Sequence, residues 1–134
     1  MNIYQKYKEQ SVFSMSGAEL LNLLYVEADK RLARAELALE EKMYQEFENS
    51  MVRVRDIVHY LNSVLDMSYP ISRDLRRIYT YLLYDISRVK SGRERQKEEI
   101  GRIRHILSEL REGFEEAANR TGENSLGRNQ GILG

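Results

Sequence analysis

The sequence contains few side chains in arrangements that could perform catalysis or bind a metal ion. It has no cysteine and two histidines, so a metal site would have to combine histidine with carboxylates. Helical bundles that bind metals in this way use a Glu-x-x-His pair from each of two helices. Here the residue three before His59 is Asp56, and the residue three before His105 is Arg102. One imperfect pair and one cationic neighbour do not form a ligand set. We therefore predict no metal site, with His105 on a helix surface and His59 near the edge of the core.

Patterns for nucleophilic catalysis and phosphate binding are also missing from the sequence. No serine lies in a nucleophile elbow or beside a paired base. The glycines before residue 119 are isolated from one another, whereas a phosphate-binding loop gathers them. Asp66 stands beside a helix break at Ser68, where a turn residue that bonds the local backbone is commoner than a catalytic one. The sequence thus predicts neither an enzyme nor a bound cofactor.

The prominent feature of the sequence is instead its surplus of apolar and aromatic side chains. Hydrophobic residues make up 42% of the 134 residues, with nine tyrosines and no tryptophan. Tyrosine suits surfaces that bury a ring and keep a wet hydroxyl group. More apolar positions are present than one buried stripe per helix requires. They fit a wide core stripe, a groove for an amphipathic partner helix, or a self-association surface.

Apolar residues recur at intervals of three and four along four segments, as is typical of amphipathic helices. The segments predict helices at about 17–41, 44–67, 72–91 and 93–118. A shift in the phase of the pattern predicts a tight turn near Lys42. Ser68-Tyr69-Pro70 breaks the second helix, Ser72 is placed to cap the third, and Ser91-Gly92 to end it.

These elements predict an all-α chain, an antiparallel up-and-down four-helix bundle that forms one domain over residues 16–118. Residues 1–15 are too apolar for a free tail, so we expect an N-terminal arm packed on the bundle. Residues 119–134 contain four glycines and few apolar side chains, which indicates a disordered C-terminal tail. No stretch approaches the roughly 20 apolar residues of a membrane span, and the N-terminus lacks the apolar run of a signal peptide. A cytoplasmic location is therefore expected.

The charges balance overall but are unevenly distributed. The chain has 21 basic and 21 acidic residues, yet residues 73–104 carry ten basic and five acidic side chains. A basic segment of this kind could bind nucleic acid. Because the acidic residues are interleaved with the basic ones, a solvated helix face of mixed charge is the favoured interpretation.

Three motifs stand in a recognisable order along the chain. An N-terminal Tyr4-Gln5-Lys6-Tyr7 precedes a helix end, Leu61-Asn62-Ser63-Val64-Leu65-Asp66-Met67, and then the helical Ile78-Tyr79-Thr80-Tyr81-Leu82. In order and spacing these motifs resemble the flagellin-specific export chaperones, the FliS family, over about residues 1–118. The chain differs from many members at Val26-Glu27-Ala28, where the family often has Gly-Ala, and in the turn at Ser68-Tyr69-Pro70, where glycines are common.

The resemblance implies an export chaperone that uses neither ATP nor metal. Such chaperones hold the disordered C-terminal region of flagellin in the cytosol, prevent its premature polymerisation and aid its delivery to the flagellar type III export apparatus. An export-gate component and a competing flagellar assembly factor are further candidate partners. Neither nucleic-acid binding nor membrane insertion is expected, and the free chain is expected to be a monomer or a weak dimer.

The candidate client-binding residues are the outward apolar positions of the predicted second to fourth helices: Ile57, Tyr60, Val64, Tyr81, Leu83, Tyr84 and Ile106. The residues expected to shape this surface from beneath belong to the motifs that carry the resemblance: Leu65, Asp66, Leu75 and Tyr79. Tyr4 and Tyr7 belong to the arm, which we expect either to occupy an apolar pocket in the absence of client or to take part in docking to the export machinery.

Two other functional classes are compatible with the residues. In the first, the surplus apolar face closes a homodimer, and the chain is a self-associating structural bundle. In the second, the chain is a helical nucleic-acid-binding domain whose binding falls steeply with salt. The basic residues available for that role are Arg73, Arg76, Arg77, Arg88, Arg93 and Arg95.

Overall fold

A computed structural model describes residues 17–133 of the chain, with side chains for residue 17 and for residues 19–116. The predicted arm, residues 1–15 with Tyr4 and Tyr7, lies outside the described residues. Over the described range the chain is all-α and has no strand, as predicted. Its elements are α2 (Gly17–Glu40), α3 (Tyr44–Ser63), α4 (Pro70–Gly92), the 3₁₀ helix η1 (Arg93–Gln96) and α5 (Lys97–Leu133). The run from α4 through η1 to α5 has no non-helical residue within it.

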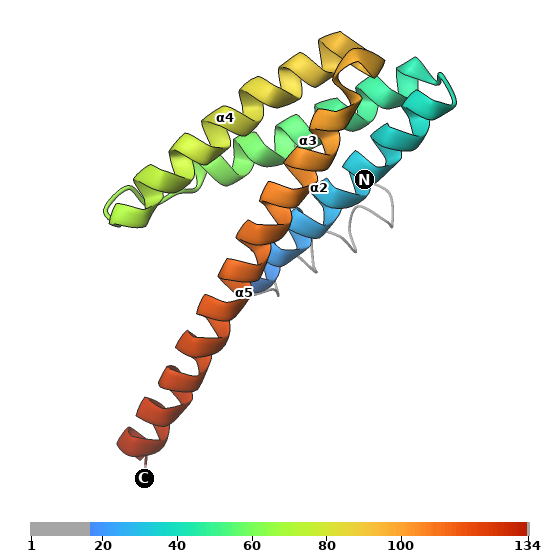
Figure 1. Cartoon of the computed structure of the whole chain (residues 1–134). Helices are drawn as coiled ribbons and strands as arrows, with labels where there is room; N and C mark the ends of the chain where they lie inside the picture. Colours follow the sequence, from blue (N-terminus) through green and yellow to red (C-terminus); the bar gives the residue numbers. More distant parts are fainter. Residues whose placement is uncertain (1–16, 134) are drawn as a thin grey trace, which may run out of the picture.

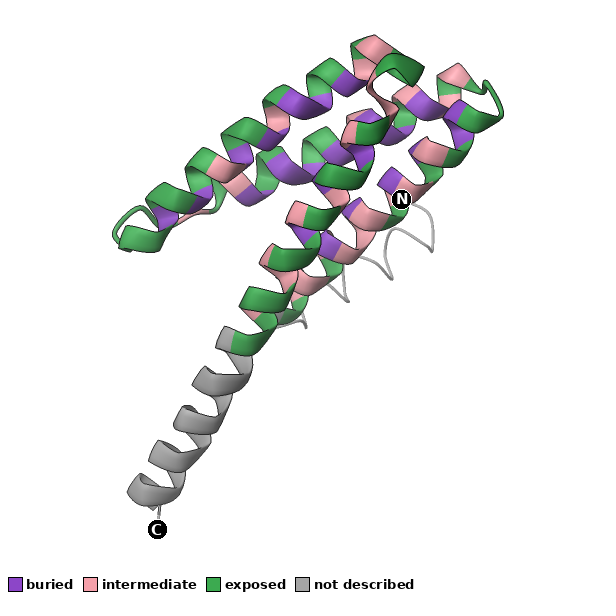
Figure 2. Cartoon of the chain, in the orientation of Figure 1, coloured by how far each residue is buried: buried purple, intermediate pink, exposed green. Residues whose placement is uncertain are grey.

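The α-helices alternate in direction (Figure 1). Contacts join α2 to α3, α3 to α4, and α2 to α5, with a further seam between α4 and α5. The pairing of residues shows the antiparallel order, because Arg111 on α5 bonds Asn22 early in α2, whereas Lys97 pairs with Glu40 at the end of α2. The buried residues lie on the sides of the helices that face one another (Figure 2).

The core consists of the apolar stripes that the spacing of the sequence predicted. On α3 the buried residues include Phe47, Met51, Val54, Val58 and Leu61, spaced by three or four residues. This spacing keeps them on one side of a helix with 3.6 residues per turn. The stripes of α2, α4 and α5 meet them in one cluster of buried residues. The core is therefore continuous through all the α-helices.

Tyr25 of α2 is a core residue. Its side chain is 2% exposed and its ring lies 5.9 Å from that of Phe114 on α5. Its hydroxyl group is 2.6 Å from the hydroxyl group of Tyr79 on α4, so one hydroxyl donates to the other. Burial, followed by this hydrogen bond, raises the pKa of Tyr25 and keeps its hydroxyl group protonated. The pair satisfies two polar groups inside the core.

The turn between α2 and α3 forms where the phase of the apolar pattern shifts. Lys42 has a φ of 57°, the left-handed conformation that usually belongs to glycine after a helix end. The amide of Met43 donates to Ala38 (2.8 Å) and the amide of Lys42 to Leu39 (3.1 Å), which is the hydrogen-bond pattern of a Schellman motif. This local pattern explains how the chain reverses without glycine or proline.

The break between α3 and α4 begins and ends earlier than predicted. α3 stops at Ser63 and α4 begins at Pro70, whereas the sequence predicted 67 and 72. Proline is favoured at the first helical position, because its fixed φ suits a helix and its missing N–H would have no partner there. Ser72 is consequently no cap. It is buried in the first turn of α4 and its hydroxyl group donates to the carbonyl of Asp66 (2.6 Å).

The chain reverses again after Gly92, where α4 ends as predicted. The left-handed residue is Arg93, with a φ of 53°, and its guanidinium group lies 4.3 Å from the ring centre of Tyr44 on α3. Arg93 also pairs with Glu48 (3.4 Å), and the Tyr44 hydroxyl group donates to Glu94 (2.5 Å). These contacts fasten the reversal to the beginning of α3.

The last helix continues beyond its predicted end at 118. The backbone of α5 is helical to Leu133, although the composition of 119–134 indicated a disordered tail. An isolated glycine costs a helix about 1 kcal/mol relative to alanine, which weakens the helix without ending it. The segment contains no proline, the residue that would end it outright.

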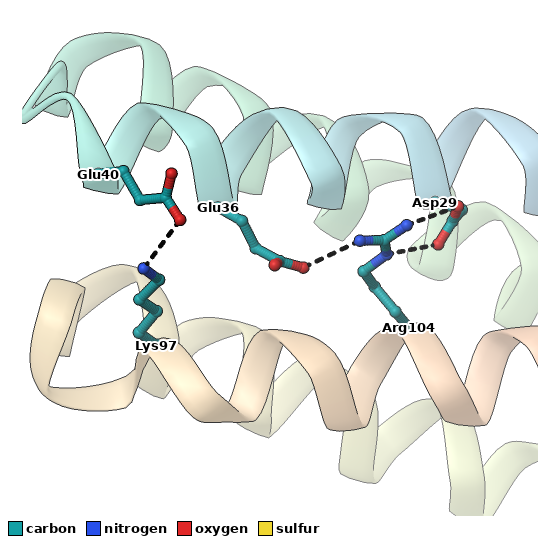
Figure 3. Close-up of polar contacts among 5 residues, drawn as sticks. All are labelled: Asp29, Glu36, Glu40, Lys97 and Arg104. Atoms are coloured by element: carbon teal, nitrogen blue, oxygen red, sulfur yellow. Dashed lines mark hydrogen bonds and ion pairs between the residues drawn. The ribbon is translucent and has the colours of Figure 1, made fainter.

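Ion pairs close the seam between α2 and α5 (Figure 3). Arg104 reaches across from α5 and makes two bonds to Asp29 (2.8 and 3.2 Å) and one to Glu36 (3.1 Å). These bonds, Asp29 first, raise the pKa of the Arg104 guanidinium group above its usual value. Lys97, at the start of α5, pairs with Glu40, at the end of α2 (3.2 Å). The two-pronged bond to Asp29 fixes the register of α5 on α2.

The hydroxyl pair in the core is expected to stabilise the fold measurably. Tyr25→Phe and Tyr79→Phe should each lower the free energy of unfolding by about 1–2 kcal/mol, because each leaves a buried hydroxyl group without its partner. The double variant should lose less than the sum of the two. Urea unfolding measures the free energy of unfolding of all three variants, and the exposed Tyr60→Phe serves as the control. Strictly additive losses would show that the two hydroxyl groups do not interact.

The left-handed residue at the first turn gives a second expectation. Lys42→Gly should raise the free energy of unfolding by about 1 kcal/mol, because glycine adopts a positive φ without steric strain. The matched control is Lys30→Gly in the middle of α2, which should lower stability by about 1 kcal/mol. If both changes destabilise equally in a thermal or urea melt, the turn does not hold residue 42 in this conformation.

Candidate functional site

The residues that could have performed chemistry do not assemble a reactive site. Over the residues that the structure describes, no group of three or more His, Cys, Asp or Glu side chains could hold a metal ion. His105 is on the surface, as predicted, where it lies 3.1 Å from Glu109. His59 is exposed too, away from the core edge where it was expected. None of the described helices is long and apolar enough to cross a membrane.

Asp66 has the turn role that the sequence favoured. Its carboxylate accepts from the amide (3.0 Å) and the hydroxyl group (2.7 Å) of Ser68. These two bonds, the hydroxyl bond first, lower the pKa of the Asp66 carboxyl group. Asp66 is exposed in the turn, so it orders the loop between α3 and α4 and does not lie beneath a binding surface.

Four of the predicted client-binding residues are exposed: Tyr60, Val64, Tyr81 and Tyr84. Tyr60 and Val64 lie on α3 or directly after it, and the two other tyrosines lie on α4. Tyr84 is the most exposed of the large apolar side chains, at 63%. An exposed aromatic ring on a rigid helix is a suitable contact for a partner, because it buries a large area with little loss of side-chain freedom.

Three other predicted positions do not face outward. Ile57 is 3% exposed and belongs to the core, while Leu83 and Ile106 are half-buried and pack against it. Ile57 is buried because α3 contacts both α2 and α4, so the buried stripe of α3 is wider than a single seam. The sequence therefore assigned a core residue to the surface.

Three of the residues expected beneath the surface are buried or half-buried. Leu75 and Tyr79 are buried in α4, and Leu65 is half-buried against the core. Tyr79 supports α4 from inside through its hydrogen bond to Tyr25. These side chains fix the position of the helix that presents Tyr81 and Tyr84.

The sequence missed three exposed apolar residues in the turn between α3 and α4 and in the first turn of α4. Met67, Tyr69 and Ile71 are all exposed, and together with Val64 we name them the apolar turn. Turns are normally polar, so a proline-containing break flanked by apolar side chains was the available signal. The apolar turn and the exposed tyrosines of α3 and α4 form the candidate partner-binding surface.

Two acidic side chains, the buried Asp85 of α4 and the half-buried Glu99 of α5, lie close together between these helices. Asp85 is 0% exposed, and no hydrogen-bond partner is found for its carboxylate oxygens or for Oε2 of Glu99 within the described part of the chain. Arg88 approaches Asp85 at 3.6 Å, and Arg102 approaches Glu99 at 3.9 Å. Burial, followed by the neighbouring carboxyl group of Glu99, raises the pKa of Asp85. A proton on Asp85 relieves the repulsion in this seam.

A cavity of about 510 Å³ lies between α2 and α5. Its lining includes the buried Tyr25 together with Arg104, Arg111 and Gly101. The charges within it are matched, because Arg104 is bonded to Asp29 and Glu36. The charged groups that line it are thus already paired within the chain, which makes it a weaker candidate than the exposed tyrosines.

Comparison with known proteins gives one result. The family model described as Flagellar protein FliS matches residues 1–121 of the chain. No curated protein matches the sequence.

The buried acid predicts a dependence of stability on pH. A carboxyl group whose pKa is raised by folding binds its proton more tightly in the folded state. Its contribution to stability therefore falls as the pH rises from the ordinary value of 3.8 through the folded pKa. Asp85→Asn removes this loss, so the variant should be more stable than the parent by about 1 kcal/mol near neutral pH, with a smaller difference in mild acid.

Urea unfolding at several pH values measures this effect. Asp74→Asn is the matched control, because Asp74 is an exposed acid on the same helix and should leave the pH dependence almost unchanged. A difference between the parent and Asp85→Asn that stays constant with pH would contradict the raised pKa.

Proposed function

The chain belongs to the FliS family of flagellar proteins, and from this membership we propose that it holds the disordered C-terminal region of flagellin and prevents its premature polymerisation. Members of the family are cytoplasmic chaperones of flagellum biogenesis that bind flagellin and are not enzymes. The finer points proposed here are which part of the client is bound and which residues bind it.

The observation that supports the proposal most is the group of exposed apolar side chains on α3, α4 and the turn that joins them. A folded helical domain needs no apolar side chains in a turn, and contiguous exposed apolar residues commonly mark a site of interaction. Tyr60, Val64, Tyr81 and Tyr84 would contact the client directly, and the apolar turn extends the surface at one end. An amphipathic segment could lay its apolar side along such residues.

A disordered client suits a surface of this kind. A segment that folds on binding covers a large area, and the free energy of ordering it reduces the net affinity. The complex can then be specific and still release its client for export. We propose delivery to the flagellar type III export apparatus as the purpose of that release.

The remaining partner assignments follow from the resemblance alone. We propose that Tyr4 and Tyr7 of the arm occupy an apolar pocket in the absence of client or contribute to docking on the export machinery. An export-gate component and a competing flagellar assembly factor remain proposed partners. The free chain is proposed to be a monomer or a weak dimer, and the exposed apolar turn is where a dimer would form.

Calorimetric titration with the C-terminal segment of flagellin from the same organism tests the function. We expect saturable binding of one segment per chain, with a negative heat-capacity change from burial of apolar surface and a gain in helicity by circular dichroism. No heat and no change in helicity at tens of micromolar, about 10⁻⁵ M, would reject the proposal. A stable dimer that ignores the segment would make self-association the better explanation.

Paired variants test the placement of the surface. Tyr81→Ala together with Tyr84→Ala should weaken binding of the segment by about tenfold or more, because two exposed aromatic contacts are removed. The matched control is Leu37→Ala, which removes an exposed apolar side chain on α2, outside the candidate surface. If the tyrosine pair and the control both bind within about twofold of the parent, the client lies elsewhere.

A further inference from the structure

The outer side of α4 carries arginines near both ends and two tyrosines between them. Arg73, Arg77, Tyr81, Tyr84 and Arg88 follow one another at steps of four, four, three and four residues, so they share one side of the helix. All five are exposed, and we name them the α4 stripe. The stripe contains two of the tyrosines proposed to contact the client. It is therefore a basic surface as well as an aromatic one.

The charge at the N-terminal end of the stripe is not paired within the described part of the chain, whereas Arg88 at the other end approaches Asp85 at 3.6 Å. Over the described residues, Arg73, Arg76 and Arg77 have no ion-pair partner, whereas Arg34 on α2 pairs with Glu46 and Arg104 on α5 pairs with Asp29. A solvated helix face of mixed charge would carry acids spaced to match the arginines.

The acids of α4 supply that match only in part. Asp85 is buried and approaches Arg88 at 3.6 Å, three residues further along. Asp74 is exposed three residues before Arg77 but forms no ion pair within the described residues. The unpaired positive charge of the outer side therefore lies at Arg73 and Arg77, near the start of α4.

A pocket of about 410 Å³ continues the stripe at the C-terminal end of α4. The side chains that surround it offer hydrogen-bond donors: Ser87, Arg88, Ser91, Arg95 and Gln96, with the ring of Tyr84 beside them. Its lining contains no carboxylate. Arg88 is held by the Tyr84 ring, 5.7 Å from its centre, and by Gln96 at 3.5 Å. Donors held in place around a small pocket fit a carboxylate side chain.

We propose that the part of the client that lies along α4 is acidic, with carboxylates at both ends of the stripe and an apolar stretch between them. One group of carboxylates would meet Arg73 and Arg77, a second would enter the pocket beside Arg88 and Arg95, and the apolar stretch would cover Tyr81 and Tyr84. Arg77 and Arg88 are about 16 Å apart along the helix axis, at 1.5 Å per residue. A helical client would therefore carry its acidic groups about eleven residues apart. This inference rests on the proposed function and specifies the chemistry of the client.

Replacing the arginines tests the inference. Binding of the flagellin C-terminal segment is measured by calorimetry at about 50 mM and about 500 mM NaCl. The variant Arg73→Gln with Arg77→Gln should bind about tenfold more weakly at low salt and within about twofold of the parent at high salt, because salt screens the charges that it lacks. Arg95→Gln should show the same pattern from the pocket end. The control is Lys30→Gln with Arg55→Gln, which removes two exposed charges on α2 and α3 and should bind like the parent at both salts.

A change in the client shows whether the effect is a direct pairing. A segment with its acidic residues replaced by amides should bind the parent more weakly, and each arginine variant should discriminate less than the parent between this segment and the natural one, because it has lost one of the two ends that meet the acids. Thermal melts of each variant confirm that the fold is retained.

Three results would overturn the inference. If the parent binds the segment and the arginine variants bind within about twofold at both salts, the client on α4 is not acidic, and the proposed function stands. If the parent binds no segment at either salt, the proposed function itself fails. If a single-stranded RNA of about 20 nucleotides binds the parent more tightly than the segment does, and the arginine variants lose it, the stripe is a nucleic-acid site.

Discussion

Each helix of the core must bury an apolar side against two neighbours, and the rest of the structure depends on this constraint. α2 lies against α3 and α5, and α3 lies against α2 and α4. A helix between two others needs an apolar stripe wider than one seam. Tyr25 and Ile57 meet this need, although a single heptad seam would have left both outside. Apolar residues that remain exposed after both seams are filled are the ones available to a partner.

The sequence predicted the helices well because their spacing records which side is buried. The turn at Lys42 could be located because the spacing changes phase there. Its left-handed conformation could not, since lysine gives no local sign of a positive φ. The break before α4 was located from Pro70, yet its edges were misplaced, because the same proline can end one helix or begin the next. The composition of residues 119–134 also led to a predicted end of α5 at 118, whereas the helix continues through this segment, which contains no proline.

The candidate surface was partly predictable for a similar reason. Tyr60, Val64, Tyr81 and Tyr84 could be identified as outward because they lie off the apolar stripe of their helices. Met67 and Tyr69 could not, because a turn has no periodicity from which exposure can be deduced, and Ile71 stands at the very start of α4, before its periodic stripe begins. The burial of Asp85 was also beyond the sequence, since a count of charges treats every acid as if it were in water. The basic character of the segment 73–104, by contrast, was already visible in the charge count.

The bond between Asp29 and Arg104 joins positions 75 residues apart, whereas the turn at Lys42 is closed by residues 38–43 alone. These two contacts should form at very different rates, because the entropy lost on closing a loop grows with its length and non-local contacts form slowly. We expect the α2–α3 hairpin to form early and the docking of α5 on α2 to complete folding. Hydrogen exchange would then find the earliest protection beside Lys42 and the latest in α5. On a ribosome, the chain would remain an open set of helices until its last long helix had emerged.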